Sequence, residues 1–78
     1  MKPIVIASTT CGPCAALKSF INEHEIKADI YLIGTLEGDT LAESHEVMTV
    51  PTILIGGEKF EGDSPAIRKL LLKGKTNL

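Results

Sequence analysis

The feature that most constrains this chain is a pair of cysteines set where an apolar run gives way to a helical pattern. The motif reads Cys11-Gly12-Pro13-Cys14 and contains both cysteines of the sequence. Residues 2–8 before it predict a short strand, and a helix is expected from Cys14 onward. Two thiols at this spacing can close a small disulfide ring and reopen it by exchange, so the strand, C-x-x-C, helix order indicates a redox motif.

The predicted position of Cys11 favours its reactive form. At a helix N-terminus, unpaired backbone N–H groups and the helix dipole stabilise negative charge, and the thiolate is the nucleophile of a cysteine. Pro13 suits the first helical turn, because its missing N–H would have had no intrahelical partner. Cys14 lies one turn further on, so we expect it to be less exposed than Cys11.

The next part of the chain predicts a strand, a loop and a short helix. The first helix is expected to end near residue 24, and residues 28–33 are rich in strand-forming side chains. A strand, helix and strand of this length predict a parallel crossover unit, which is almost always right-handed. Residues 34–39 are typical of a loop, and Asp39 or Thr40 is expected to cap a helix that ends near residue 45.

The last third predicts a hairpin and a final helix. A strand is expected from Pro51 to residue 55, a turn over residues 56–59 and a returning strand at residues 60–61. Ser64-Pro65 supplies an N-cap and a first helical residue, and Gly74 is expected to end the helix. The predicted core consists of aliphatic and aromatic positions: Ile4, Ile6, Leu17, Phe20, Ile21, Leu32, Ile53, Ile55, Ile67 and Leu71.

Composition narrows the class of protein. With 78 residues, 44% hydrophobic and 23% charged, residues 1–78 are expected to form a single globular domain and a monomer. A net charge of -2 without a basic block argues against nucleic acid, and no apolar run is long enough to span a membrane. We expect no secretory signal and therefore a cytoplasmic location, where a C-x-x-C is more often catalytic or metal-binding than structural.

The element order β-α-β-α-β-β-α, the C-G-P-C motif and Thr49-Val50-Pro51-Thr52 before the hairpin together resemble the thioredoxin superfamily. The small size resembles a glutaredoxin-type minimal domain, whereas C-G-P-C resembles thioredoxin. The resemblance implies an α/β fold with a four-stranded mixed sheet and three helices. It implies that Cys11 attacks, that Cys14 resolves and that Val50-Pro51 is cis, with Gly12 and Pro13 in supporting roles. The implied substrate contacts are Thr10, Thr49, Val50, Gly62 and Asp63.

Departures from the family patterns bear on the electron donor. Thioredoxins usually carry Trp before the motif and a buried acid in the preceding strand, but this chain has Thr10 and no acid in Ile4–Ala7. Glutaredoxins tend to carry a basic residue shortly before the first cysteine and Gly-Gly before an acid that leads into the last helix. Here Ser8–Thr10 and Glu61-Gly62-Asp63 stand at those places, and Glu61 adds negative charge near the site for an anionic tripeptide.

We therefore predict a reducing dithiol–disulfide oxidoreductase for protein disulfides. No bound cofactor is expected, because electrons would come from NADPH through thioredoxin reductase, or from glutathione. Ribonucleotide reductase is one acceptor that the resemblance implies, although the C-terminal aromatic and arginine pattern of such redoxins is missing from residues 73–78. A glutathione-dependent glutaredoxin is the alternative enzyme.

A metal or iron–sulfur binding module is the alternative of another class. Zinc requires four ligands, or three with water, and His24 and His45 are the only further histidine or cysteine candidates, at irregular spacing. Gly-Pro between the cysteines disfavours a bridging cluster. We therefore expect no metal, and both histidines are expected to be surface or half-buried helix residues.

Overall fold

The computed structural model of the chain describes residues 2–76, which contain four strands and three helices. In chain order these are β1 (Ile4–Ala7), α1 (Gly12–Glu23), β2 (Asp29–Leu32), α2 (Leu36–Ser44), β3 (Thr52–Ile55), β4 (Glu58–Glu61) and α3 (Pro65–Thr76). The predicted order and the four-stranded mixed sheet with three helices are confirmed.

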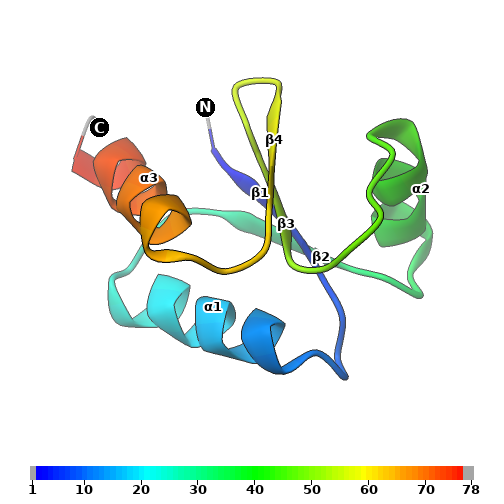
Figure 1. Cartoon of the computed structure of the whole chain (residues 1–78), viewed down its shortest axis with the longest axis horizontal. Helices are drawn as coiled ribbons and strands as arrows, with labels where there is room; N and C mark the ends of the chain where they lie inside the picture. The colour runs from blue at the N-terminus through cyan, green and yellow to red at the C-terminus, as the bar shows by residue number, and fades with distance from the viewer. Residues whose placement is uncertain (1, 77–78) are drawn as a thin grey trace.

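The sheet has the strand order β2-β1-β3-β4. β1 pairs in parallel with β2 and antiparallel with β3, and β3 pairs antiparallel with β4. Helices α1 and α3 cover one face of the sheet, whereas α2 lies on the other side (Figure 1). β1 is therefore a central strand, and a short loop connects its C-terminal end to the start of α1.

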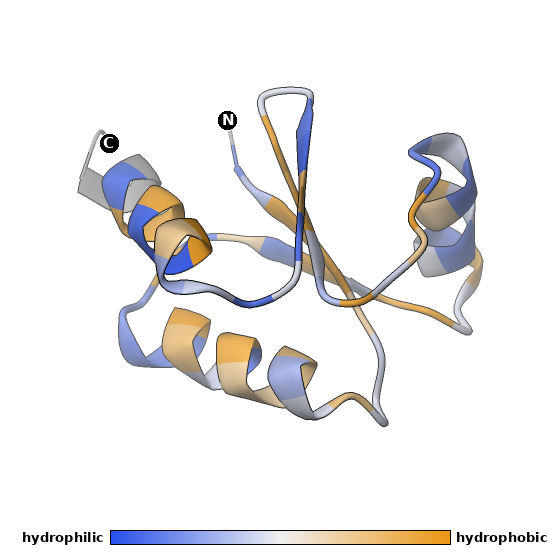
Figure 2. Ribbon diagram, viewed as in Figure 1, coloured by the Kyte–Doolittle hydropathy of each residue, from blue (hydrophilic) through white to orange (hydrophobic). Residues whose placement is uncertain are grey.

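The hydrophobic core lies between the sheet and the helices α1 and α3, and the central strands carry much of it (Figure 2). Buried members are Val5, Ala7, Cys14, Leu17, Ile21, Ile26, Ile53, Ile67 and Leu71. Six predicted core residues are buried, namely Ile6, Leu17, Ile21, Ile53, Ile67 and Leu71, whereas Ile4, Phe20, Leu32 and Ile55 are half-buried. The alternation along β1 and β3 directs every second side chain into this core.

The predicted start of α2 is wrong, because Thr35 and neither Asp39 nor Thr40 is its N-cap. Thr35 Oγ1 accepts a hydrogen bond from the Gly38 N–H at 3.1 Å and donates one to the Leu32 carbonyl at 2.7 Å. Asp39 instead folds back to accept from the Gly34 N–H at 2.9 Å. Much of the segment expected to be a loop is therefore helix.

Two other boundaries also differ from the prediction. β4 begins at Glu58 because Gly56 and Gly57, with φ of 56° and 87°, make the turn by themselves. Gly74 does not end α3, which continues to Thr76. The hydroxyl of Ser64 accepts from the Ile67 N–H at 3.3 Å, in agreement with its expected capping role.

Candidate active site

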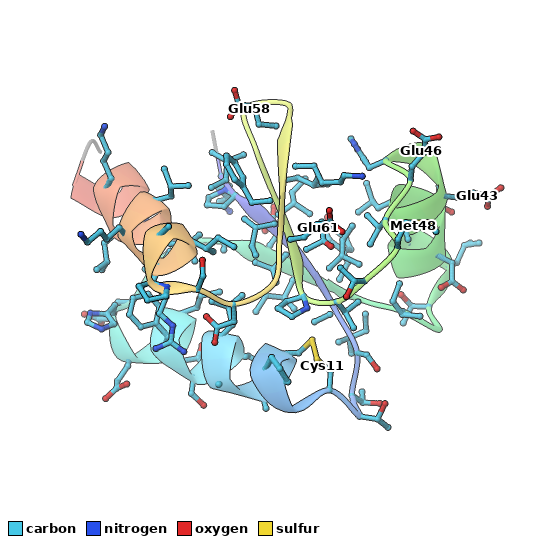
Figure 3. All side chains as sticks on the ribbon, viewed as in Figure 1. Cys11, Glu43, Glu46, Met48, Glu58 and Glu61 are labelled. Carbon is cyan, nitrogen blue, oxygen red and sulfur yellow. A yellow bond between two sulfur atoms is a disulfide. The ribbon has the colours of Figure 1, made fainter. Side chains whose placement is uncertain are left out.

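The two cysteines meet at the start of α1, where a disulfide joins them across a Cα–Cα distance of 5.2 Å. Figure 3 shows the sulfur atoms of this pair at the N-terminal end of the helix, facing the sheet. Cys11 is half-buried, whereas Cys14 is 4% exposed and belongs to the hydrophobic core. The expected difference in exposure between the two cysteines is confirmed, so a partner reaches Cys11 more readily.

Cys11 is the N-cap of α1, with φ of -101° and ψ of 118°. Its Sγ accepts a hydrogen bond from the Cys14 N–H at 3.2 Å, and its carbonyl accepts from the Ala15 N–H at 3.2 Å. Pro13 occupies the first turn, which holds no acidic side chain. The orphan N–H groups and the positive end of the helix dipole therefore act on Cys11 without competition from a carboxylate.

The cis Val50–Pro51 peptide bond lies opposite Cys11. The Val50 carbonyl oxygen is 3.7 Å from Cys11 Sγ. The Pro51 carbonyl accepts from the Gly62 N–H at 2.7 Å, and the Thr52 hydroxyl donates to the Thr49 carbonyl at 2.6 Å. The structure thus brings Val50 to the redox pair and ties Gly62 to the same segment, although these residues are far apart in the sequence.

Thr10 and Asp63 were also expected at this site. Thr10 lies in the exposed loop before α1, and its hydroxyl is 3.2 Å from that of Ser8. Asp63 lies between Gly62 and the start of α3, and its side chain is 11% exposed. It lines a hollow separate from the cavity beside the cysteines, and it has an intramolecular partner.

That partner is Arg68, which lies near the start of α3. Its Nε and Nη2 donate to the two carboxylate oxygens of Asp63 at 2.9 Å and 2.8 Å. The hydrogen bonds to Asp63 and the charge of that carboxylate raise the pKa of Arg68 above its ordinary value. The guanidinium also lies 4.9 Å from the centre of the Phe20 ring on α1. A separation of five residues at a helix start matches no regular periodicity, so the pair gave no sequence signal.

A cavity of about 210 Å³ adjoins both cysteines. Its wall consists of Ala7, Ser8, Thr9, Cys11, Cys14, Ala15, Lys18 and Leu32. A larger hollow of about 450 Å³ lies elsewhere, between α1 and α3, around Phe20 and the Asp63–Arg68 pair. Lys18 belongs to this wall although its side chain is exposed.

The histidines lie away from the disulfide. His24 caps the C-terminus of α1 with its ring centre 4.4 Å from that of Phe20, and His45 caps the C-terminus of α2. Across residues 2–76, no three or more His, Cys, Asp or Glu side chains gather in a way that could hold a metal ion. Within the same residues, no helix is long and apolar enough to cross a membrane.

Comparison with known proteins agrees with this geometry. The glutaredoxin family model matches residues 2–60. The thioredoxin of Staphylococcus aureus is 31% identical over 75 residues, which cover 91% of this chain and 68% of that protein. The same relationship holds for thioredoxin of several strains of that species.

Solved structures show the same fold. The thioredoxin-like protein BC3987 superposes with a TM-score of 0.73 at 21% identity, covering 90% of this chain and 99% of that chain. A mutant of the same protein gives a TM-score of 0.75 at 23% identity, with 91% and 99% covered. A buckwheat glutaredoxin in complex with glutathione gives 0.64 at 24% identity, with 94% and 70% covered. With the family match and the Cys11–Cys14 disulfide, the chain belongs to the glutaredoxin family of the thioredoxin superfamily, and it is a thiol–disulfide oxidoreductase.

Proposed function

We propose that this chain reduces disulfides of other proteins in the cytoplasm, and that thioredoxin reductase with NADPH returns it to the dithiol form. The observation that carries the choice of donor is the paired state of Asp63. Both of its carboxylate oxygens accept from Arg68, so the guanidinium already offsets the negative charge that would attract a glutathione ammonium group. The chain acts as a monomer with no bound cofactor, and ribonucleotide reductase is the first acceptor to test.

The reaction follows from the roles proposed for the two cysteines. The Cys11 thiolate attacks one sulfur of the partner disulfide, a mixed disulfide forms, and the other partner sulfur leaves as a thiolate that takes up a proton. Cys14, as a thiolate, then attacks Cys11 Sγ, and the second partner thiolate leaves. Two electrons have then passed to the partner, and the Cys11–Cys14 disulfide seen here has formed.

The partner segment is proposed to lie against the cis-proline strand start. Val50 lies beside Cys11, which supports the proposal that its backbone would pair with an extended chain, a common mode of peptide recognition. Thr49 would extend this contact on one side and Thr10 on the other. Main-chain pairing of this kind does not depend on the partner's side chains, so it suits a reductant of several protein disulfides.

Three further observations support thioredoxin reductase over glutathione as the donor. The Gly62 N–H is already donated to the Pro51 carbonyl at 2.7 Å, so it is not free for a tripeptide. Glu61 is exposed next to Gly62, where its charge would repel the carboxylates of glutathione. The loop of Ser8, Thr9 and Thr10 before Cys11 supplies no cation to offset that repulsion.

The test is reduction of the oxidised protein by NADPH with thioredoxin reductase, run beside NADPH with glutathione and glutathione reductase. We expect rapid NADPH consumption in the first assay and slow consumption in the second. The reverse result would contradict the proposed donor. Metal content of the same purified sample distinguishes the binding-module alternative, since bound zinc or iron in stoichiometric amount would support that class instead.

A variant sharpens the assay. Arg68→Leu removes both hydrogen bonds to Asp63 and leaves its carboxylate for another ligand, whereas Lys69→Leu removes a neighbouring charge and keeps the Asp63–Arg68 pair. We expect Arg68→Leu to raise the glutathione-dependent rate and Lys69→Leu to leave it unchanged. Activity of both variants with thioredoxin reductase reports whether the fold is intact. No gain for Arg68→Leu would mean that the Asp63–Arg68 pair does not set the choice of donor.

A further inference from the structure

The second half of the proposed reaction requires a thiolate in an unfavourable place. Cys14 is 4% exposed and packs in the hydrophobic core, where burial disfavours a charged sulfur. The strand that precedes the motif, Ile4–Ala7, is aliphatic and offers no carboxylate to accept the proton. The proton of Cys14 must therefore go to an acceptor other than a carboxylate of this strand, and another group must stabilise the charge that remains.

The cavity of about 210 Å³ beside the cysteines meets both requirements. Its volume accommodates more than one water molecule, and the hydroxyl groups of Ser8 and Thr9 in its wall can hold water by hydrogen bonds. Lys18 is the one charged side chain among the residues that form this wall. It follows Cys14 by one helical turn in α1, so the two side chains lie on the same side of the helix.

The remaining groups around Cys14 carry no charge. From β1 and β2 the cavity wall receives Ala7 and Leu32, and apart from the two cysteines the core cluster adds only aliphatic and aromatic side chains. The one other titratable group in the wall is Cys11, the partner of Cys14 in the reaction. The Asp63–Arg68 pair lines the separate hollow near Phe20. A lysine ammonium is charged at neutral pH, so Lys18 is the source of positive charge that this space offers.

We propose that Lys18 is a positioning residue for resolution: its ammonium group stabilises the Cys14 thiolate across this cavity, and water in the cavity accepts the Cys14 proton. This inference rests on the proposed role of Cys14 as the resolving cysteine. The proton passes from Cys14 to water, the thiolate then forms the bond to Cys11 Sγ, and the bond from Cys11 to the partner sulfur breaks. Lys18 keeps its own proton throughout and is not consumed.

The proposal predicts that removal of the Lys18 ammonium slows resolution by Cys14 at low pH and speeds it at high pH. An opposite charge within a few ångströms lowers a thiol pKa by about one unit or more, so loss of the ammonium moves the pH profile of resolution upward by about one unit. Thiolate nucleophilicity rises with thiol pKa at a Brønsted slope near one half. Resolution in a Lys18→Met variant is therefore expected to be about threefold slower below the transition and about threefold faster above it.

The experiment uses the full chain in its reduced form with excess 2,2′-dithiodipyridine, a neutral disulfide. Release of the first pyridinethione reports attack by Cys11 and depends on reagent concentration. Release of the second reports resolution by Cys14 and does not. We would measure both rates against pH for the natural chain, Lys18→Met, Lys18→Arg and the control Lys27→Met, which removes an exposed lysine outside the cavity wall. Titration of the two cysteine Cβ resonances by NMR gives the same comparison at equilibrium.

For Lys18→Met we expect the plot of the second-release rate against pH to cross that of the natural chain. The rate of the first release should be unchanged, and the titration of Cys14 should move to higher pH. Lys18→Arg restores the natural profile, and Lys27→Met leaves it unaltered. An unchanged second release, or an equal change in both releases, would overturn the proposal, and so would the same shift in Lys27→Met. Failure of the underlying cysteine roles is recognised separately, because Cys14→Ser would then accumulate no mixed disulfide at Cys11.

Discussion

The sulfur of Cys11 caps the helix that begins directly after it, accepting the backbone N–H of Cys14 at 3.2 Å. The same sulfur atom therefore caps the N-terminus of α1 and lies at the positive end of the helix dipole. A hydrogen bond donated to sulfur favours the thiolate, so in the reduced protein the same contact that stabilises α1 would support the nucleophilic role proposed for Cys11. The Val50 carbonyl lies 3.7 Å from the same sulfur, so the cis-proline segment faces the cysteine that caps the helix.

The assignment of roles to the two cysteines predicts different products for two single substitutions. Cys14→Ser retains the capped sulfur of Cys11 and removes the resolving thiol, so a stable mixed disulfide at Cys11 should accumulate with a disulfide substrate. Cys11→Ser should abolish exchange, because Cys14 is buried. Mass spectrometry of the intact protein and of its peptides locates the adduct. An adduct that forms through Cys14 would reverse the assignment.

Gly38 is expected to tolerate no side chain. It is buried at the start of α2, and a Cβ built on it would overlap the carbonyl carbon and oxygen of Leu32. Because backbone rather than a flexible side chain must move, we expect Gly38→Ala to lower the free energy of unfolding by about 1–3 kcal/mol. Urea unfolding followed by circular dichroism measures the change.

Gly12 provides the matched control for this helix-start glycine. A Cβ at Gly12 meets no atom within 4 Å, so Gly12→Ala is expected to be neutral or to stabilise α1 by up to about 1 kcal/mol. Equal unfolding midpoints for the two variants would contradict this prediction, because they would mean that the backbone at Leu32 can move away from a Cβ at Gly38 without loss of stability.

The N-cap of α2 gives a third prediction. Thr35 Oγ1 contacts both the Gly38 N–H and the Leu32 carbonyl, so Thr35→Ala should lower the free energy of unfolding by about 1 kcal/mol. Thr40 offers a control within the same helix, since its hydroxyl only donates back to the Leu36 carbonyl. Thr40→Ala should change stability little. A larger loss for Thr40→Ala in thermal or urea unfolding would contradict the assignment of the cap.

Lys59 ties the C-terminal end of α2 to the hairpin. Its Nζ donates to the carbonyls of His45 and Glu46 at 3.3 Å and 3.1 Å, although β4 and α2 are separate elements. A cation at a helix C-terminus satisfies orphan carbonyls and complements the dipole, so Lys59→Met should cost about 1 kcal/mol in unfolding free energy. Hydrogen exchange of the last turn of α2 should also quicken, whereas Lys27→Met should leave both measurements unchanged.

Much of the fold was predictable because its signals are local. The strand before Cys11, the helix after it, the Gly56-Gly57 turn and the Ser64-Pro65 helix start each depend on a few consecutive residues. The cis Val50–Pro51 bond was implied by a motif of the family. The start of α2 was mispredicted because Asp39 and Thr40 are capable caps in isolation, whereas the Gly38 N–H and the Leu32 carbonyl both bond the hydroxyl of Thr35.

Sequence alone thus accounts for the element order, the redox pair and its place at a helix start, since backbone preference and hydrophobic period operate over a few residues. Tertiary structure decided which groups surround that pair. The contact of Cys11 with Val50, and the cavity wall in which Leu32 of β2 meets Cys14 and Lys18 of α1, depend on segments that meet only after the sheet forms. Hydrogen bonds and charge interactions of this kind act over a few ångströms in space, and distance along the chain does not reveal them.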